Sequence, residues 1–339
     1  MFGIYRFFLS LLVVASHLLE PTMYKTGAQA VSCFFVLSGY LMAKSIDATY
    51  GRTWSGFFKY ITNRVLRIYP TYWLVLLSSC LFLMFFPSKV LISQMVLTSD
   101  LSAVFANITL FNLYSYDNIF VPPAWSLTIE LLFYIVIGLI PLDFKMARLG
   151  FILSVPLLAA VYFLGFDTNE HITRLAQGQL CFSLGAFVNY SSRQIRKYKL
   201  VYSIVILSLL IFSWYILSYF SLKIYPSIMY IGAFASGAMI IVLRSFSFEN
   251  FSAPLGRQAL VKADKFLGDI AYPLFLVHYF IGQLLAAVGI PPFTIPFFLS
   301  SLLTSIGISA LMVKYFEDRI NRLRDLVRGR KAFSASQGR

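Results

Sequence analysis

Long apolar runs separated by short polar segments are the dominant pattern along the chain. An apolar run of about 17–25 residues is long enough to cross the hydrocarbon core of a bilayer as a helix. We predict ten transmembrane helices from this pattern, over residues 5–20, 27–44, 69–87, 124–141, 148–165, 173–190, 199–220, 225–243, 267–288 and 294–315. The run over 173–190 is the weakest of them, because Gln177 and Gln179 interrupt it.

Two segments fit the pattern less well. Residues 90–121 are moderately apolar but contain scattered aspartates and asparagines, which favours a surface or re-entrant piece over a further crossing. Residues 319–339 are basic and end in a stretch rich in Ser, Gln and Gly, which is typical of a juxtamembrane helix followed by disorder. We therefore divide the chain into a transmembrane domain, 1–318, and a basic cytoplasmic tail, 319–339.

The composition agrees with a membrane protein. Of the 339 residues, 59% are hydrophobic and only 12% are charged, and the mean hydropathy is +0.76. These values are too apolar for a soluble chain of this length. The predicted fold class is all-α, a polytopic integral membrane helical bundle. The three cysteines lie in apolar stretches without metal-ligand spacing, so no metal site is expected.

The net charge of +14 raises the question of a nucleic-acid partner, which the distribution of the charge answers. With a cytoplasmic N-terminus, the ten predicted crossings leave only four of the 28 Lys and Arg residues outside, namely Lys25, Lys89, Arg174 and Lys223. Cytoplasmic loops concentrate Lys and Arg, so both termini are predicted to be cytoplasmic. The charge then serves topology and contact with the anionic lipid bilayer, and no nucleic-acid partner is expected.

Arg6 and His17 form the first candidate for chemistry. They lie eleven positions apart in the first apolar run, which is about three helical turns, so both side chains are expected on one face. The same spacing places the imidazole ~16 Å above the arginine, near the middle of the bilayer. Such a pair suits an anionic cofactor at the membrane surface with proton chemistry above it. Alone, Arg6 is equally a topological anchor and His17 a packing residue.

Glu130 and His278 are the next candidates. Glu130 follows the helix start at Pro122-Pro123 by almost two turns and is the only carboxylate well inside a predicted span. Its expected depth is close to that of His17, so the two are natural partners, either in catalysis or in a structural salt bridge. His278 lies eleven residues into the ninth run, which also places it near the middle of the membrane.

Arg64 and Arg67 lie one helical turn apart where the third run begins. One interpretation is an interfacial anchor with an aromatic belt; the other is a phosphate clamp, because paired arginines bind phosphates bidentately. Three further residues are predicted to line the substrate path, namely Trp125, Ser126 and Gln29.

Five stretches together resemble one known family. They are Arg6-x10-His17, FFVLSGY over 34–40, Arg64-x2-Arg67-Ile-Tyr-Pro, WSLTIE over 125–130 and AYPLFLVH over 271–278. In this order they resemble acyltransferase family 3, the membrane O-acyltransferases of bacterial surface glycans. The resemblance extends from residue 6 to residue 278. Asp269 departs from the pattern, because a neutral residue is expected at its position.

The resemblance implies an activity and a set of roles. In this family an acyl group, usually acetyl, passes from cytoplasmic acyl-coenzyme A to a sugar hydroxyl on the other side of the bacterial inner membrane. By resemblance, His17 is the main catalytic imidazole, and Glu130 and His278 line the transfer site. The three arginines at positions 6, 64 and 67 contact the nucleotide and pyrophosphate of acetyl-coenzyme A. The acceptor is expected to be O-antigen, capsule or exopolysaccharide.

Two other functions fit parts of the same pattern. Glu and His side chains within the membrane can relay protons in a proton-coupled transporter. A membrane acyltransferase of different architecture, acting on lipid or protein, would use His278 as its sole essential histidine and leave His17 dispensable. Nothing in the sequence decides between direct transfer and an acyl-enzyme intermediate, or identifies the acceptor sugar.

Overall fold

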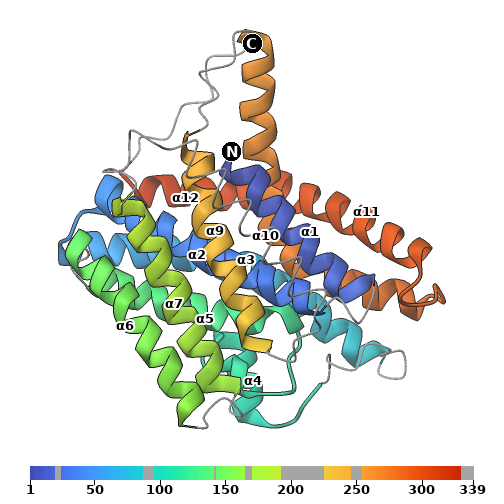
Figure 1. Ribbon diagram of the computed structural model, residues 1–339. Helices are drawn as coiled ribbons and strands as arrows, with labels where there is room; N and C mark the ends of the chain where they lie inside the picture. Colours follow the sequence, from blue (N-terminus) through green and yellow to red (C-terminus); the bar gives the residue numbers. More distant parts are fainter. Residues whose placement is uncertain are drawn as a thin grey trace.

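The computed structural model describes residues 1–19, 24–86, 95, 97–140, 143–164, 170–191, 225–245 and 254–329. Over these ranges the chain forms helices and no strand (Figure 1). The longer helices are α1 (Phe2–Leu18), α2 (Tyr24–Ser45), α3 (Trp54–Phe85), α4 (Leu101–Thr109), α5 (Trp125–Leu139), α6 (Phe144–Phe163), α7 (Glu170–Ser191), α9 (Tyr225–Ser245), α10 (Pro254–Ala287), α11 (Ile295–Met312) and α12 (Asp318–Val327). Short π-helical turns η2 (Ile46–Tyr50) and η8 (Val313–Glu317) follow α2 and α11, and 3-10 turns η4 (Leu113–Ser115) and η5 (Pro122–Ala124) precede α5.

The predicted fold class, an all-α polytopic membrane bundle, is confirmed. Every predicted run that falls on described residues overlaps a helix, and the run over 199–220 lies outside them. Within the described ranges, six stretches are long and apolar enough to cross a membrane, namely Thr26–Tyr50, Trp54–Phe85, Pro122–Leu139, Phe144–Val161, Gly256–Ala287 and Ile295–Val327. Helix α7, which contains Gln177 and Gln179, is not one of them. The count of ten crossings stays a prediction.

Helices α3 and α10 begin much earlier than the apolar runs that predicted them. Helix α3 begins at Trp54, where the Thr53 side chain accepts a hydrogen bond from the Gly56 N–H and caps the helix. Helix α10 begins at Pro254, and its first turns project from the bundle (Figure 1). Hydropathy detects only the apolar part of such a helix, so the predicted runs leave out its first turns.

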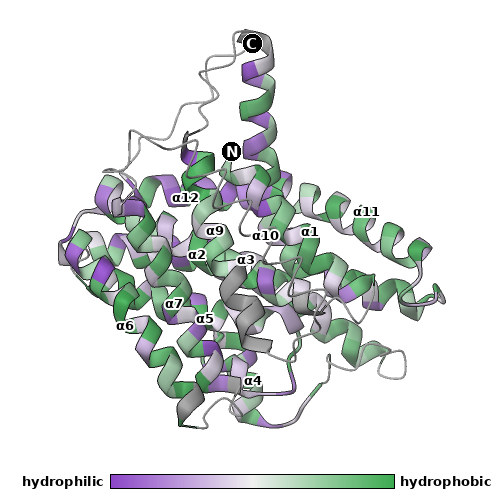
Figure 2. Cartoon of the chain, in the orientation of Figure 1, coloured by the Kyte–Doolittle hydropathy of each residue, from purple (hydrophilic) through white to green (hydrophobic). Residues whose placement is uncertain are grey.

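Helix α11 shows the inside-out pattern of a lipid-facing helix. It buries Ser301, Ser305 and Ser309 completely, while Leu303 and Leu311 are 68% and 56% exposed. A helix of a soluble protein would do the reverse. Small polar residues inside and large apolar residues outside suit a helix surrounded by hydrocarbon. Figure 2 shows the same contrast, with α11 largely hydrophobic and hydrophilic residues gathered on α12.

The segment predicted as a surface or re-entrant piece contains α4, which spans only nine residues. A helix of that length rises ~14 Å and cannot cross a bilayer. The backbone carbonyls of residues 107–110, at its C-terminal end, each accept a hydrogen bond from a side chain of α3 or α5. The donors are Tyr72, Trp73, Tyr69 and Thr128, in that order. Three aromatic residues that suggested an aromatic belt therefore hold α4 in place by binding carbonyls that the helix leaves free.

Close packing of α1 against α10 positions the candidate chemistry. A Cβ atom on Gly3 would lie 1.7 Å from the Asp264 carbonyl oxygen, and one on Gly268 would lie 2.7 Å from the Gly3 Cα. Seven residues further along α1, the Ser10 hydroxyl donates to the Ala271 carbonyl at 2.9 Å. The two helices therefore touch backbone to backbone, which aligns the face of α1 that contains Arg6 and His17 with α10.

Candidate active site

A cavity of about 260 Å³ opens among α1, α2, α3, α5, α10 and α12. In the described part of the chain its lining includes five arginines, Arg6, Arg64, Arg67, Arg324 and Arg328. We call it the arginine cavity. The three arginines predicted from the sequence all line it. Figure 1 shows α12 lying across the end of the bundle at which α1 begins, the predicted cytoplasmic end, with α4 near the opposite end.

The arginines of this cavity have donors to spare. Among the described residues, the buried Nε atoms of Arg6, Arg64 and Arg324 have no hydrogen-bond partner. Leaving a buried donor unpaired costs about 1–3 kcal/mol, and more when the group is charged. A guanidinium that is already buried and keeps one N–H without an acceptor is suited to receive an anionic ligand. The cavity therefore has the electrostatics of a phosphate site.

Arg64 is held in place by aromatic rings. Its guanidinium carbon lies 5.1 Å from the ring centroid of Tyr60 and 5.2 Å from that of Tyr134. The Tyr134 hydroxyl donates to Glu130 Oε1 at 2.6 Å, and the Ser38 hydroxyl donates to the same oxygen at 2.9 Å. Glu130 thus lines the cavity wall and fixes one of the two rings against which Arg64 rests.

The expected partnership between Glu130 and His17 is wrong, because His17 pairs with His278. Their Nδ1 and Nε2 atoms lie 2.9 Å apart, and the two rings are within 5° of parallel. The residues come together because α1 packs directly on α10, whereas Glu130 on α5 bonds to α2. Similar depth was expected for all three residues, so depth alone did not identify which of them touch. We call His17 and His278 the histidine pair.

The hydrogen bonds define which nitrogens of the pair carry protons. His278 Nδ1 lies 3.1 Å from the Leu274 carbonyl oxygen. A carbonyl only accepts, so His278 Nδ1 carries the proton and its Nε2 is an acceptor in the neutral ring. His17 Nδ1–H therefore donates to His278 Nε2, which leaves the lone pair of His17 free at Nε2. With both rings neutral, this chain of hydrogen bonds leaves an oriented acceptor at His17 Nε2.

Helix α10 connects the arginine cavity with the histidine pair. Ala271 and Phe275 line the cavity, and His278 follows Phe275 by about one turn on the same face. Phe275 meets Phe34 of α2 edge to face, with ring centroids 6.0 Å apart. The two aromatic rings thus mark the apolar end of the cavity next to the histidines.

The three residues predicted to line the substrate path have different surroundings. Ser126 lines the arginine cavity and is buried. Trp125 lies under a cation, with the Arg174 guanidinium carbon 4.6 Å from its ring centroid. Gln29 packs beside α9, where a Cβ on Gly232 would lie 3.2 Å from its carbonyl oxygen. Trp125 and Gln29 are not part of the described cavity lining.

The sequence analysis missed the contribution of α12. A juxtamembrane helix was predicted in this region, and α12 agrees with it; residues 330–339 lie outside the described residues. The helix packs on α3, and Arg324 and Arg328, four positions apart, both line the cavity. The signal available in the sequence was that spacing, which places two cations on one helical face.

Asp269, which departs from the family pattern, has polar surroundings. It lines a small pocket beside the arginine cavity together with Arg67, Glu317 and Arg324. Glu317 accepts a hydrogen bond from the Thr71 hydroxyl at 2.9 Å. Two arginines shared between the pocket and the cavity offer compensation for the acidic charge.

Comparison with known proteins identifies the family of the chain. A family model described as an acyltransferase domain, acyltransferase family 3, matches residues 4–314. That range contains every site residue predicted from the sequence and ends before Arg324 and Arg328. No curated protein and no solved structure matches the chain. Because the match covers most of the chain, from α1 into η8, the protein belongs to acyltransferase family 3 and is a membrane acyltransferase.

Proposed function

We propose that this membrane acyltransferase moves an acetyl group from cytoplasmic acetyl-coenzyme A to a hydroxyl of an extracytoplasmic glycan such as O-antigen, capsule or exopolysaccharide, in the bacterial inner membrane. The observation that carries the proposal is the arginine cavity, which among the described residues has buried arginines with unpaired Nε atoms at one end and the oriented histidine pair about one turn of α10 beyond Phe275 at the other. The resemblance to glycan-modifying relatives supports the choice of acceptor.

The arginine cavity suits the donor. Coenzyme A carries a diphosphate and a phosphomonoester at one end and the acyl thioester at the other. Arg6 and His17 lie ~16 Å apart along α1, so phosphates bound near Arg6 direct the thioester toward the histidines. Arg64, with its unpaired Nε, and Arg67 would bind the diphosphate through charge-assisted hydrogen bonds. The apolar surface of Phe34 and Phe275 would contact the pantetheine arm.

The histidine pair supplies the base. His17 Nε2 takes the proton of the acceptor hydroxyl while the hydroxyl oxygen attacks the thioester carbonyl carbon. The carbon–sulfur bond then breaks, and the departing thiolate takes that proton from the His17 imidazolium, giving the ester and free coenzyme A. His278 Nε2 accepts from His17 Nδ1–H throughout and stabilises the imidazolium, as the third member of a catalytic triad does.

A two-step route uses the same atoms. His17 Nε2 attacks the thioester itself, and coenzyme A leaves as the thiolate. The acyl-imidazolium then passes its acyl group to the hydroxyl, whose proton goes to the thiolate. Purified protein mixed with radiolabelled acetyl-coenzyme A in the absence of acceptor separates the routes. Label that stays on wild-type protein, and not on the His17→Ala variant, supports two steps. Unlabelled protein that turns over once acceptor is added supports direct transfer.

The function itself is tested on the intact cell surface. Mass spectrometry of surface glycans from cells that contain the protein should show a gain of one acetyl unit per modified sugar, and cells with His17→Ala should lack it. Immunoblotting of membranes controls for protein level. Normal glycan acetylation in the His17→Ala strain would overturn the proposal. Modified lipid or protein in place of glycan would keep the chemistry and change the acceptor.

A proton-coupled transporter explains the site less well, and the family match is to an acyltransferase. A proton-coupled carrier has no need for the arginine cavity, in which several arginines keep N–H groups that are unpaired within the described residues. Binding of acetyl-coenzyme A to the purified protein separates the two functions, because a proton-coupled carrier would not bind it.

A further inference from the structure

Helix α12 buries a residue of unexpected type. On this helix Leu323 and Leu326 are 52% and 58% exposed, whereas Arg324 is only 8% exposed. Burying an arginine is costly unless an anion or several acceptors compensate it. The leucines face outward and the cation faces inward, so the packing of α12 is organised around the charged side chain.

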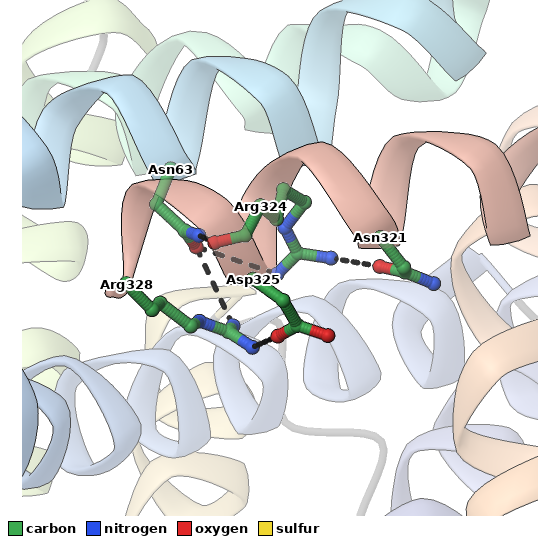
Figure 3. Close-up of polar contacts among 5 residues, drawn as sticks. All are labelled: Asn63, Asn321, Arg324, Asp325 and Arg328. Carbon is green, nitrogen blue, oxygen red and sulfur yellow. Dashed lines mark hydrogen bonds and ion pairs between the residues drawn. The ribbon is translucent and has the colours of Figure 1, made fainter. Parts of the chain in front are cut away.

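The described residues compensate Arg324 only partly. Its guanidinium donates to Asn321 Oδ1 at 2.6 Å and lies 3.5 Å from Asn63 Oδ1. Both acceptors are neutral amides, and the Arg324 Nε is unpaired within the described part of the chain. Figure 3 shows these contacts, with Asn63 reaching α12 from α3. The site thus holds a buried cation without a carboxylate at ion-pair distance among the residues described.

Arg328 extends the same cluster to the rim of the cavity. It lies 3.5 Å from Asn63 Oδ1 and pairs with Asp325 at 3.1 Å. Its side chain is 27% exposed, so it reaches both solvent and the arginine cavity. The Asn63 amide nitrogen donates to the Arg324 carbonyl at 3.1 Å, which fixes the position of α12 independently of either guanidinium.

The charge of the lining indicates how much anionic charge a ligand must bring. Five arginines and one carboxylate, Glu130, belong to the described lining, and Asp269 and Glu317 of the adjoining pocket share Arg67 and Arg324 with it. The diphosphate of the donor supplies about two negative charges, and its phosphomonoester adds about 1.5–2 more with three acceptor oxygens. The proposed function assigns Arg6, Arg64 and Arg67 to the diphosphate. The two arginines of α12 remain for a second phosphate group.

We propose that Arg324 and Arg328 bind the 3′-phosphate at the adenosine end of the donor, so that α12 makes the enzyme selective for coenzyme A over its dephosphorylated form. This inference rests on the proposed function. The 3′-phosphate lies at the end of coenzyme A remote from the thioester. Arg328 occupies the corresponding place in the site, at the solvent rim and away from the histidine pair.

The test compares two donors on the purified full-length protein. Acetyl-coenzyme A and acetyl-3′-dephospho-coenzyme A differ only in the phosphate at issue. Isothermal titration should show that wild type binds acetyl-coenzyme A about tenfold or more tightly than the dephospho form, the effect of a charge-assisted contact. In Arg324→Gln and in Arg328→Gln this ratio should fall toward one, because the affinity for acetyl-coenzyme A decreases while that for the dephospho form stays.

Arg322→Gln is the matched control, since Arg322 is on the same helix but exposed, and it should keep the wild-type ratio. Arg324→Lys should restore part of it. The inference would be overturned if both glutamine variants kept the affinity ratio of wild type. It would also be overturned if they lost affinity for the two donors equally. If wild type itself bound the two donors equally tightly, the inference would be overturned and the proposed function would stand. Failure of wild type to bind either donor would overturn the proposed function itself. Arg328→Gln keeps the test valid if Arg324→Gln fails to fold, because Arg328 is partly exposed and its substitution disturbs the packing less.

Discussion

The arginine cavity and the histidine pair differ in how their polar atoms are partnered. In the cavity, the buried Nε atoms of Arg6, Arg64 and Arg324 are unpaired in the described part of the chain. In the histidine pair, three of the four ring nitrogens take part in one hydrogen-bonded chain that ends at the Leu274 carbonyl. One region lacks acceptors that a ligand can supply. The other is complete without a ligand.

The difference indicates a division of labour. A buried cation with an unpaired donor gains free energy when an anion binds, so under the proposed function the arginine cavity supplies affinity for the donor. A base held by a chain of fixed hydrogen bonds needs no rearrangement when the reaction begins, so under the proposed function the histidine pair raises the rate of the chemical step. Variants in the cavity should therefore change donor affinity, and variants in the pair should change turnover. Each prediction below tests that separation.

The largest effect is expected for His17→Ala. Removing the general base should lower kcat by about 10²–10⁴-fold, while the dissociation constant for acetyl-coenzyme A stays within about twofold of wild type, because no phosphate contact is lost. Turnover with an acceptor glycan and titration with donor measure the two quantities. His171→Ala, at the third histidine of the chain on α7, is the matched control and should leave both values unchanged. Loss of donor binding in His17→Ala would contradict the separation.

His278→Ala should have the next largest effect. Without its Nε2 acceptor, His17 loses the bond that orients the ring, and kcat should fall by about 10²-fold with donor affinity unchanged. His278→Gln offers an amide oxygen to His17 Nδ1 and should recover part of the rate. A higher kcat in His278→Gln than in His278→Ala shows that His278 acts by orienting His17 and not only by filling space. If His278→Ala abolished turnover and His17→Ala did not, the alternative architecture with a single essential histidine would be correct.

In the cavity, Arg64→Gln should weaken binding of acetyl-coenzyme A by about tenfold, the value of one charge-assisted hydrogen bond. At saturating donor its kcat should remain close to that of wild type. Lys59→Gln, an exposed site on the same helix, is the control for charge alone and should bind donor normally. A fall in kcat at saturation, with unchanged affinity, would place Arg64 in the chemistry and contradict the proposed division.

Local periodicity explains which parts of the site the sequence predicted correctly. The eleven-residue spacing of Arg6 and His17 and the three-residue spacing of Arg64 and Arg67 are properties of single helices, so the shared faces follow from helical geometry. The helical class follows equally from apolar runs longer than a bilayer requires. These predictions need no knowledge of which helices are neighbours.

The remaining features depend on tertiary contacts. Glu130 and His17 were expected as partners from similar depth, but the touching backbones at Gly3 and Gly268 bring α10, and hence His278, to His17. Arg324 resembles any other cytoplasmic arginine under the positive-inside rule. The packing of α12 on α3, which includes the bond from the Asn63 amide to the Arg324 carbonyl 261 positions away in sequence, brings Arg324 to the cavity that it lines.

Glu130 gives the smallest expected effect and tests to which of the two regions a residue belongs. The sequence analysis placed Glu130 in catalysis, whereas its contacts place it in the wall of the arginine cavity. Its Oε1 accepts from Tyr134, whose ring supports Arg64. Glu130→Gln keeps an acceptor oxygen, so donor affinity should fall by only about twofold to threefold, the loss of charge assistance in one bond. In Glu130→Ala the donor affinity should fall further. Tyr134→Phe removes the hydroxyl that donates to Glu130, and its donor affinity should match that of Glu130→Gln. Steady-state kinetics with saturating donor should give near wild-type kcat for Glu130→Gln. A large fall in kcat there, with donor affinity intact, would return Glu130 to the catalytic group and end the division between the two regions.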